Sequence, residues 1–189
     1  MGFLNSGLSV VNGCNFHPKG HIHSSDAEGS KTRKGLWVDL NVGSENSHSV
    51  AVIGINPSTA SEKASDNTLT KVSRTMHSLG FERLYMLNLF ESRSVKQDEI
   101  DRNTVTDFCS DENAEILNNV DAIIIAWGIN GYDLEKENAL KILYKYSNKL
   151  FCISKNGKYP YHPRVWAYND DYKIVKFLIT TKWLNQIIY

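Results

Sequence analysis

The sequence has few of the features that mark several common protein classes. Its three cysteines, Cys14, Cys109 and Cys152, lie far apart and form no CxxC pair, which argues against a disulfide framework and a four-cysteine metal cluster. Lysine plus arginine number 21, as do aspartate plus glutamate, so no overall positive charge draws the chain to nucleic acid, although a small basic groove remains compatible with this balance. No apolar run approaches the roughly 18 residues of a membrane-spanning helix, and the N-terminus lacks a signal-peptide pattern. We therefore expect a cytoplasmic protein without membrane contact.

What is present is ordinary for one globular domain. The 189 residues are 41% apolar and 22% charged, which is enough for one well-buried core. We expect a single domain with an irregular N-terminal segment (1–35), an α/β core (36–168) and a C-terminal helix (169–189). We also expect the chain to be a monomer.

One cysteine and three histidines lie within ten residues of the N-terminal segment, at Cys14, His17, His21 and His23. Clusters of this kind can bind zinc. A polar surface loop accounts for the same residues more simply. The sequence leaves the two interpretations open, and we assign no metal and no cofactor.

Four apolar runs rich in β-branched residues predict strands that are buried on both faces. They cover 50–53, 83–90, 121–127 and 150–154. Between them, apolar residues at helical spacing predict helices over 67–79, 113–119 and 134–146. Residues 36–42 alternate as in a half-buried edge strand, and 172–189 favour a helix, although 166–177 also suit a hairpin.

This alternation of strand and helix predicts a three-layer α/β/α fold. Its sheet is expected to have a central, mostly parallel group of four strands plus an N-terminal edge strand. The carboxyl ends of parallel strands meet at one edge of the sheet, where ligands bind in open α/β folds.

All four buried strands end in polar, turn-forming residues. These ends are Asn56-Pro-Ser-Thr59, Asn88 with Arg93, Gly128-Ile-Asn130, and Lys155-Asn-Gly157 leading to His162. Their amides can form hydrogen bonds with the edge of a heterocyclic base, and their hydroxyl and main-chain N–H groups can donate to a phosphate. One histidine is also present. The chain has no nucleophile elbow, no Walker lysine loop and no GxGxxG motif. Covalent nucleophilic catalysis and nucleoside-triphosphate hydrolysis therefore have little support.

Five motifs in order carry a family resemblance over residues 36–168. They are Gly54-Ile-Asn-Pro-Ser-Thr-Ala60, Asp66-Asn-Thr68, Leu87-Asn-Leu-Phe90, Ala126-Trp-Gly128 and Lys155-Asn-Gly-Lys-Tyr-Pro-Tyr-His-Pro163. The series resembles that of the DUF1643 family, which is named for its lack of a defined function. Gly54-Ile-Asn-Pro57, Leu87-Asn88 and His162-Pro163 also resemble, more distantly, the motifs of the mismatch-specific branch of the uracil-DNA glycosylase superfamily.

The second resemblance implies a uracil-DNA glycosylase-like fold and a DNA glycosylase. Such an enzyme flips a base out of duplex DNA and hydrolyses its N-glycosidic bond, which leaves an abasic site. The implied catalytic residues are Asn56, which places a water, His162, which donates to the departing base, and Asp66, a helix cap that is also a candidate general base. The implied base-binding residues are Asn88, Phe90 and Tyr161. The implied phosphate-binding residues are Ser58, Thr59, Arg93, Lys155 and Arg164.

Departures from the glycosylase pattern leave the target base open. After Pro163 the chain lacks the serine-rich tail that inserts into DNA, so Arg164 or Trp166 would have to wedge the duplex. A modified base is as admissible as uracil, and defence against phage with modified DNA is one role for such an enzyme. The alternatives are an enzyme on free nucleosides or nucleotides, and a non-catalytic nucleotide sensor. Simple structural roles for Asn56 as a turn residue, Asn88 as a satisfied amide and His162 as a loop residue also remain open.

Overall fold

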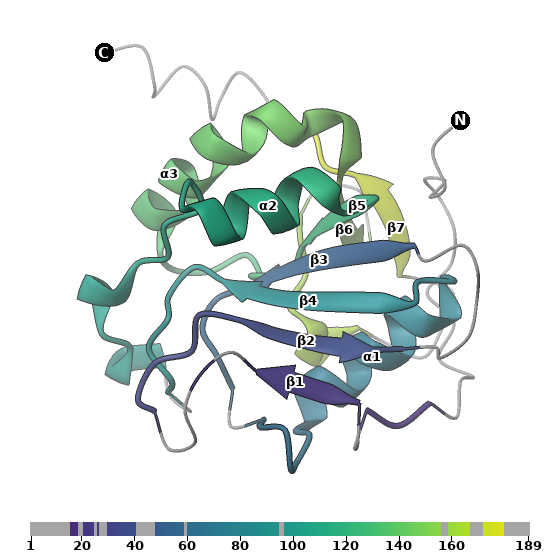
Figure 1. Ribbon diagram of the computed structural model, residues 1–189. Helices are drawn as coiled ribbons and strands as arrows, with labels where there is room; N and C mark the ends of the chain where they lie inside the picture. The colour runs from purple at the N-terminus through teal and green to yellow at the C-terminus, as the bar shows by residue number, and fades with distance from the viewer. Residues whose placement is uncertain are drawn as a thin grey trace.

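Figure 1 shows the computed structural model of the chain. The structure describes residues 16–18, 21–24, 26, 30–40, 48–58, 60–94, 97–155, 159–166 and 172–179. Within these residues no helix is both long enough and apolar enough to cross a membrane.

The described strands form one mixed, seven-stranded sheet with the order β1-β2-β4-β3-β5-β6-β7. The strands are β1 (Ile22–Ser24), β2 (Leu36–Asp39), β3 (Ser49–Gly54), β4 (Arg83–Asn88), β5 (Ala122–Ile125), β6 (Leu150–Ser154) and β7 (Lys173–Lys176). The four central strands, β4, β3, β5 and β6, are parallel. The outer strands pair antiparallel to their neighbours. The predicted parallel four-stranded centre is therefore confirmed.

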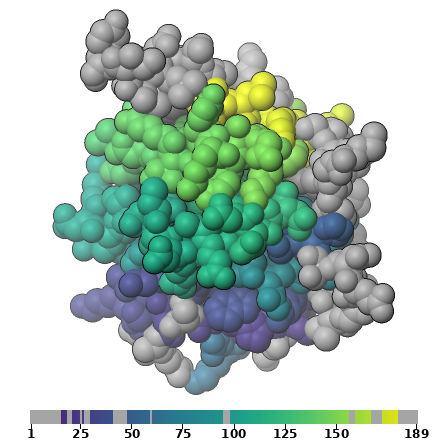
Figure 2. Space-filling view, turned by 45° about the horizontal axis from the view of Figure 1, so that its top comes forward, coloured from purple at the N-terminus to yellow at the C-terminus, as the bar shows by residue number. Residues whose placement is uncertain are grey.

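Three α-helices cover the two faces of this sheet in the described part of the chain: α1 (Asn67–Ser78), α2 (Asp111–Asn119) and α3 (Asp133–Leu143). Helix α1 lies on one face, and α2 and α3 lie on the other (Figure 1). Figure 2 shows the face that α2 and α3 cover, in teal and green. Short 3₁₀ turns lie at Gln97–Glu99, Arg102–Thr104, Tyr144–Lys149 and Pro163–Val165. The result is the expected three-layer arrangement.

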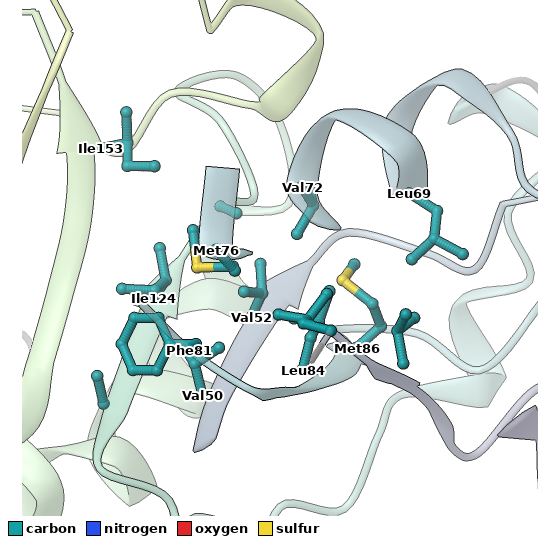
Figure 3. Packing of buried hydrophobic residues seen from close by; sticks show 14 of the residues in the cluster. Val50, Val52, Leu69, Val72, Met76, Phe81, Leu84, Met86, Ile124 and Ile153 are labelled. Atoms are coloured by element: carbon teal, nitrogen blue, oxygen red, sulfur yellow. The ribbon is translucent and has the colours of Figure 1, made fainter. Parts of the chain in front are cut away.

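The alternation of side chains along β3 explains why its sequence is apolar throughout. Val50 and Val52 point toward α1, where they join the cluster that contains Met76 (Figure 3). Ala51 and Ile53 belong to the cluster on the opposite face, with residues of α2 and α3. Because successive strand residues face opposite sides, a strand covered on both faces must be apolar at every position.

The order of the central strands creates a switch point at the carboxyl ends of β3 and β5. From β3 the chain passes through α1 to β4 on one side, and from β5 it passes through α3 to β6 on the other side. The connections therefore leave β3 and β5 in opposite directions, and a crevice opens between their carboxyl ends. This crevice is where the fold itself favours a ligand site.

Three expectations about the ends of the chain need correction. The strand predicted at 36–42 is β2, but it is not at the edge, because β1 pairs with it inside the segment expected to be irregular. At the other end, 173–176 form strand β7 instead of the start of a C-terminal helix. The spacing of apolar residues there suits both structures, and main-chain pairing with the exposed edge of β6 decides between them. Residues 180–189 lie outside the described part.

Candidate functional site

A cleft of about 880 Å³ opens at the switch point. Its walls come from the loop after β3, the first turn of α1, the loop after β5 and the segment between β6 and β7. The described lining residues are Ile55, Asn56, Ser58, Asp66, Asn67, Thr68, Ser94, Trp127, Gly128, Ile129, Asn130, Tyr161, His162, Arg164, Val165 and Tyr172. Both the size and the place of this cleft are those of small-molecule and nucleotide sites in α/β proteins.

Asn56 is held rigidly at the end of β3. Its side-chain Nδ2 donates hydrogen bonds to the carbonyl oxygens of Pro57 (3.1 Å) and Ser94 (2.6 Å). The side-chain oxygen accepts no hydrogen bond from any residue that the structure describes. Because both donors of the amide are occupied, Asn56 can present only an acceptor to a molecule in the cleft.

Asn88 lies beside Asn56, at the end of the neighbouring parallel strand. The residue is 6% exposed. In the amide orientation that satisfies its hydrogen bonds, its nitrogen donates to the main-chain carbonyl oxygens of Asn56 (3.1 Å) and Leu87 (3.2 Å). The end of this amide packs so close to the backbone of β3 that a Cβ at Gly54 would lie 2.8 Å from it. Glycine at position 54 is therefore what allows the two strand ends to carry their amides side by side.

His162 lines the cleft as a neutral imidazole. Its Nδ1 accepts a hydrogen bond from the main-chain N–H of Arg164 (3.1 Å), which places the ring proton on Nε2. Burial lowers the pKa of His162 below its usual value, and the nearby charges of Arg164 and Lys71 lower it further. No described residue accepts a hydrogen bond from Nε2. The ring can therefore donate one hydrogen bond to a ligand.

Asp66 has a structural role that the sequence anticipated. It is the N-cap of α1, where its Oδ1 accepts a hydrogen bond from the main-chain N–H of Leu69 (2.7 Å). It also lines the cleft, and it is the one carboxylate among the described lining residues. Capping uses one carboxylate oxygen, which leaves the other available for a proton or a water.

The loop after β5 is held by a buried lysine that no motif in the sequence marks. Lys136, in α3, is 3% exposed, and its ammonium group donates to the carbonyl oxygens of Gly128 (3.3 Å), Ile129 (3.3 Å) and Asn130 (3.1 Å). Burial lowers the pKa of this lysine. Gly128 has a positive φ of 78°, and a Cβ there would lie 3.3 Å from the Cβ of His162. The loop therefore packs directly against the histidine.

A smaller cavity of about 30 Å³ lies beside the cleft and shares five lining residues with it. Those five are Ile55, Asn56, Ser58, Thr68 and His162. Asn88 and Arg33 also line this cavity. Arg33 is 4% exposed, and it was not predicted as a site residue because it lies in the polar segment before β2. Its only sequence signal is the basic run 31–34.

The structure brings most of the predicted site residues to this cleft or its adjoining cavity. Those that line one or both are Asn56, Ser58, Asp66, Asn88, Tyr161, His162 and Arg164. Trp127 is buried and also forms part of the wall of the cleft. So does Tyr172, which packs edge-on against Tyr161.

Three predicted residues do not line the described walls of either space, and one lies outside the description. Phe90 is fully buried in the core and packs against Tyr132, so it is not placed to stack on a ligand. Lys155 is exposed. Arg93 is half-buried, and it lies close enough to Arg33 for the two charges to repel each other. Thr59 lies outside the described residues.

No group of three or more histidine, cysteine, aspartate or glutamate side chains among the described residues is arranged to hold a metal ion. Of the N-terminal cluster, Cys14 lies outside the description. The Nε2 of His23 lies 3.1 Å from a carboxylate oxygen of Asp39, and its ring stacks on Trp37.

Comparison with known families gives a match over most of the chain. The family described as "Protein of unknown function (DUF1643)" matches residues 35–164. No curated protein and no solved structure matches the chain. The comparisons therefore add nothing to the more distant resemblance to the uracil-DNA glycosylase superfamily.

Proposed function

The chain belongs to the DUF1643 family, and we propose that it is a DNA glycosylase, which hydrolyses the N-glycosidic bond of a modified base. The observation that carries this proposal is that one cleft holds two polar groups that form no hydrogen bond with any described residue. These are the side-chain oxygen of Asn56, an acceptor, and the Nε2–H of His162, a donor on a neutral ring. The three motifs that resemble those of the uracil-DNA glycosylase superfamily include both residues.

This pair of groups matches the needs of N-glycosidic hydrolysis. A water oxygen forms a bond to the anomeric carbon while the bond from that carbon to the base nitrogen breaks, and the bonding electrons leave with the base. Asn56 accepts a hydrogen bond from the water and so positions it, while Asp66 takes up the proton that the water loses. His162 donates a hydrogen bond to the base as negative charge develops on it.

The neutral state of His162 suits this role. A hydrogen-bond donor that keeps its proton stabilises a developing anion without first having to be charged. Asn56 is an amide and therefore a poor base, so the chemistry depends mainly on stabilisation of the leaving group. The buried Asn88 beside Asn56 has its amide held in one orientation, so it can form hydrogen bonds with one edge of the base. Tyr161, Tyr172 and Trp127 provide aromatic rings on which the base can stack.

The proposal is tested with purified protein and duplex oligonucleotides. The panel carries uracil, mismatched thymine, hydroxymethylcytosine or glucosylated hydroxymethylcytosine, and DNA purified from phage is added as a further substrate. Alkali converts each abasic site to a strand break, which is read on a denaturing gel. We expect breaks with at least one substrate. No break with any of them would contradict the proposal.

Two pairs of variants tie the activity to the cleft. Asn56→Ala and His162→Gln should each lower the rate by about 100-fold or more, as removal of one oriented polar group at a reacting centre does. The matched controls are Asn138→Ala, on the exposed surface of α3, and His48→Gln, at the amino end of β3. Both controls should keep wild-type rates. If a control variant loses as much activity as the matched cleft variant, that cleft residue has no specific role in the reaction.

A second candidate uses the same cleft on free nucleosides or nucleotides. The equal numbers of basic and acidic residues favour it, because duplex binding usually draws on a basic surface. Turnover of a nucleoside, with no DNA binding at low salt, would select this function. Binding that Asn56→Ala weakens, with no product under any condition, would instead identify a nucleotide sensor.

A further inference from the structure

Arg33 is a buried cation that has no ionic partner among the described residues. Its Nη1 donates to the carbonyl oxygen of Ala60 (2.8 Å), and its Nε has no hydrogen-bond partner although it is buried. No described carboxylate forms an ion pair with it. Buried charges in proteins are normally paired, because removal of a charge from water is costly. An arginine kept in this state is therefore unusual.

A second guanidinium group lies next to the first because of main-chain pairing. Thr32 and Ser92 form an isolated antiparallel bridge. On either side of it, the N–H of Arg33 donates to Glu91 O (2.8 Å) and the N–H of Arg93 donates to Lys31 O (2.9 Å). Since side chains alternate along paired segments, Arg33 and Arg93 lie on the same face of this ribbon, as diagonal neighbours. The Nε of Arg93 is also buried without a partner.

The positive charges of Arg33 and Arg93 repel each other. The pKa of Arg33 falls to about 10, first because of burial and second because of the charge on Arg93, while Asp66 and Asp26 oppose the shift from a distance. A bound anion would remove this repulsion and satisfy the vacant donors at the same time.

The cavity that Arg33 lines gives an anion access. It holds about 30 Å³, room for roughly two waters or for the oxygens of one small acidic group. It adjoins the large cleft through the side chains that both share, and two of these, Ser58 and Thr68, carry hydroxyl donors. Asn88 lies on the same wall.

We propose that Arg33, with Arg93 beside it, forms an oxyanion subsite in the small cavity that adjoins the cleft, so that the substrate carries a phosphate or carboxylate group there. The inference rests on the proposed function only for the identity of the cleft as the substrate site. The group can come from two sources, a phosphate of the nucleotide or a carboxylate on the base. Both present oxygen atoms that a guanidinium group binds through paired N–H donors.

The test measures binding without turnover. The full-length protein is titrated with inorganic phosphate, deoxycytidine, deoxycytidine 5′-monophosphate and 5-carboxydeoxycytidine at constant ionic strength, by calorimetry and by the shift in melting temperature. We expect at least one anionic probe to bind about 10-fold or more tightly than deoxycytidine. The monophosphate arm and the carboxyl arm identify which source supplies the anion.

Variants test whether the two arginines cause the preference for an anionic probe. Arg33→Gln and Arg93→Gln should each remove most of the preference for the anionic probe, while Arg102→Gln, an exposed arginine, should leave it unchanged. If Arg33→Gln does not fold, Arg93→Gln decides, since Arg93 is less buried. No preference for any anion, or a preference that neither arginine variant reduces, would overturn the proposal.

The outcomes separate this inference from the proposed function. If anion binding depends on the arginines but no DNA releases a base, the subsite proposal is supported and the glycosylase proposal is wrong. If DNA releases a base but anion binding does not depend on the arginines, the glycosylase proposal is supported and the subsite proposal is wrong.

Discussion

The side-chain amide of Asn88 packs against the α-carbon of Gly54, at the carboxyl ends of two neighbouring parallel strands. A Cβ at residue 54 would lie 2.8 Å from the end of that amide, and the strand register sets the two residues opposite each other. The amide is anchored there by the carbonyl oxygens of Asn56 and Leu87. This close contact between backbone and side chain forms part of the wall of the small cavity beside the cleft.

Gly54→Ala should therefore destabilise the protein by displacing Asn88. We expect a loss of about 1–3 kcal/mol in the free energy of unfolding, since the added methyl group overpacks a buried contact. In an Asn88→Ala background the same substitution should cost much less, because the opposing amide is gone. Urea unfolding of the two single variants, the double variant and the wild type measures this coupling. Additive losses would show that the two residues do not interact.

Asn56→Asp should lower stability, although it introduces a stronger base. The amide nitrogen of Asn56 donates to two main-chain carbonyl oxygens, and a carboxylate at that place would face two acceptors. We expect a loss of about 1–3 kcal/mol at neutral pH and a smaller loss in acid, where a protonated aspartate can donate again. Unfolding measured at pH 7 and pH 4, with Asn138→Asp as the exposed control, tests the sign of this difference.

Protonation of His162 should destabilise the fold. Its pKa in the folded state is lowered, so the unfolded chain binds the proton first as the pH falls below the usual value of 6.5. The contribution of the neutral ring to stability is therefore present above pH 6.5 and is lost between 6.5 and the folded-state pKa. His162→Gln should remove this part of the pH dependence.

Unfolding free energies measured between about pH 7.5 and pH 5 should thus fall less steeply for His162→Gln than for the wild type. His48→Gln serves as the control, since His48 lies at the opposite end of β3. An identical slope for the wild type and His162→Gln would contradict a buried, neutral histidine.

Lys136→Met should loosen the loop after β5 without unfolding the domain. The substitution removes three hydrogen bonds from the ammonium group to the carbonyl oxygens of Gly128, Ile129 and Asn130. It also removes a buried cation, which offsets part of the lost stability. We expect faster amide hydrogen exchange in peptides that cover 126–132, with little change in the central strands. Lys141→Met, on the exposed side of the same helix, should not alter exchange in that loop.

Local patterns were enough for most of the central fold. The apolar runs at 50–53 and 150–154 predicted strands, and the structure places strands there because a strand covered on both faces needs apolar residues throughout. The cap at Asp66 likewise set the start of α1, since a cap acts within one turn of the chain. Parallel strands then bring their polar ends to one edge, and the structure has Asn56, Asn88 and His162 close together there, as the sequence predicted.

The tertiary structure alone decided the direction of Phe90 and the environment of Arg33. Phe90 follows Asn88 by two residues, and only the covering layer of α2 and α3 determines that it joins the core on that face. Residue 33 lies in a polar stretch that reads as an exposed loop. Its burial beside Arg93 comes from pairing with a segment about sixty residues away. The same holds for β7, because a strand that fills the edge of a sheet is chosen by its partner and not by its own periodicity. The sequence by itself thus determined the strands and their polar ends, while long-range pairing decided which charges and aromatic rings surround them.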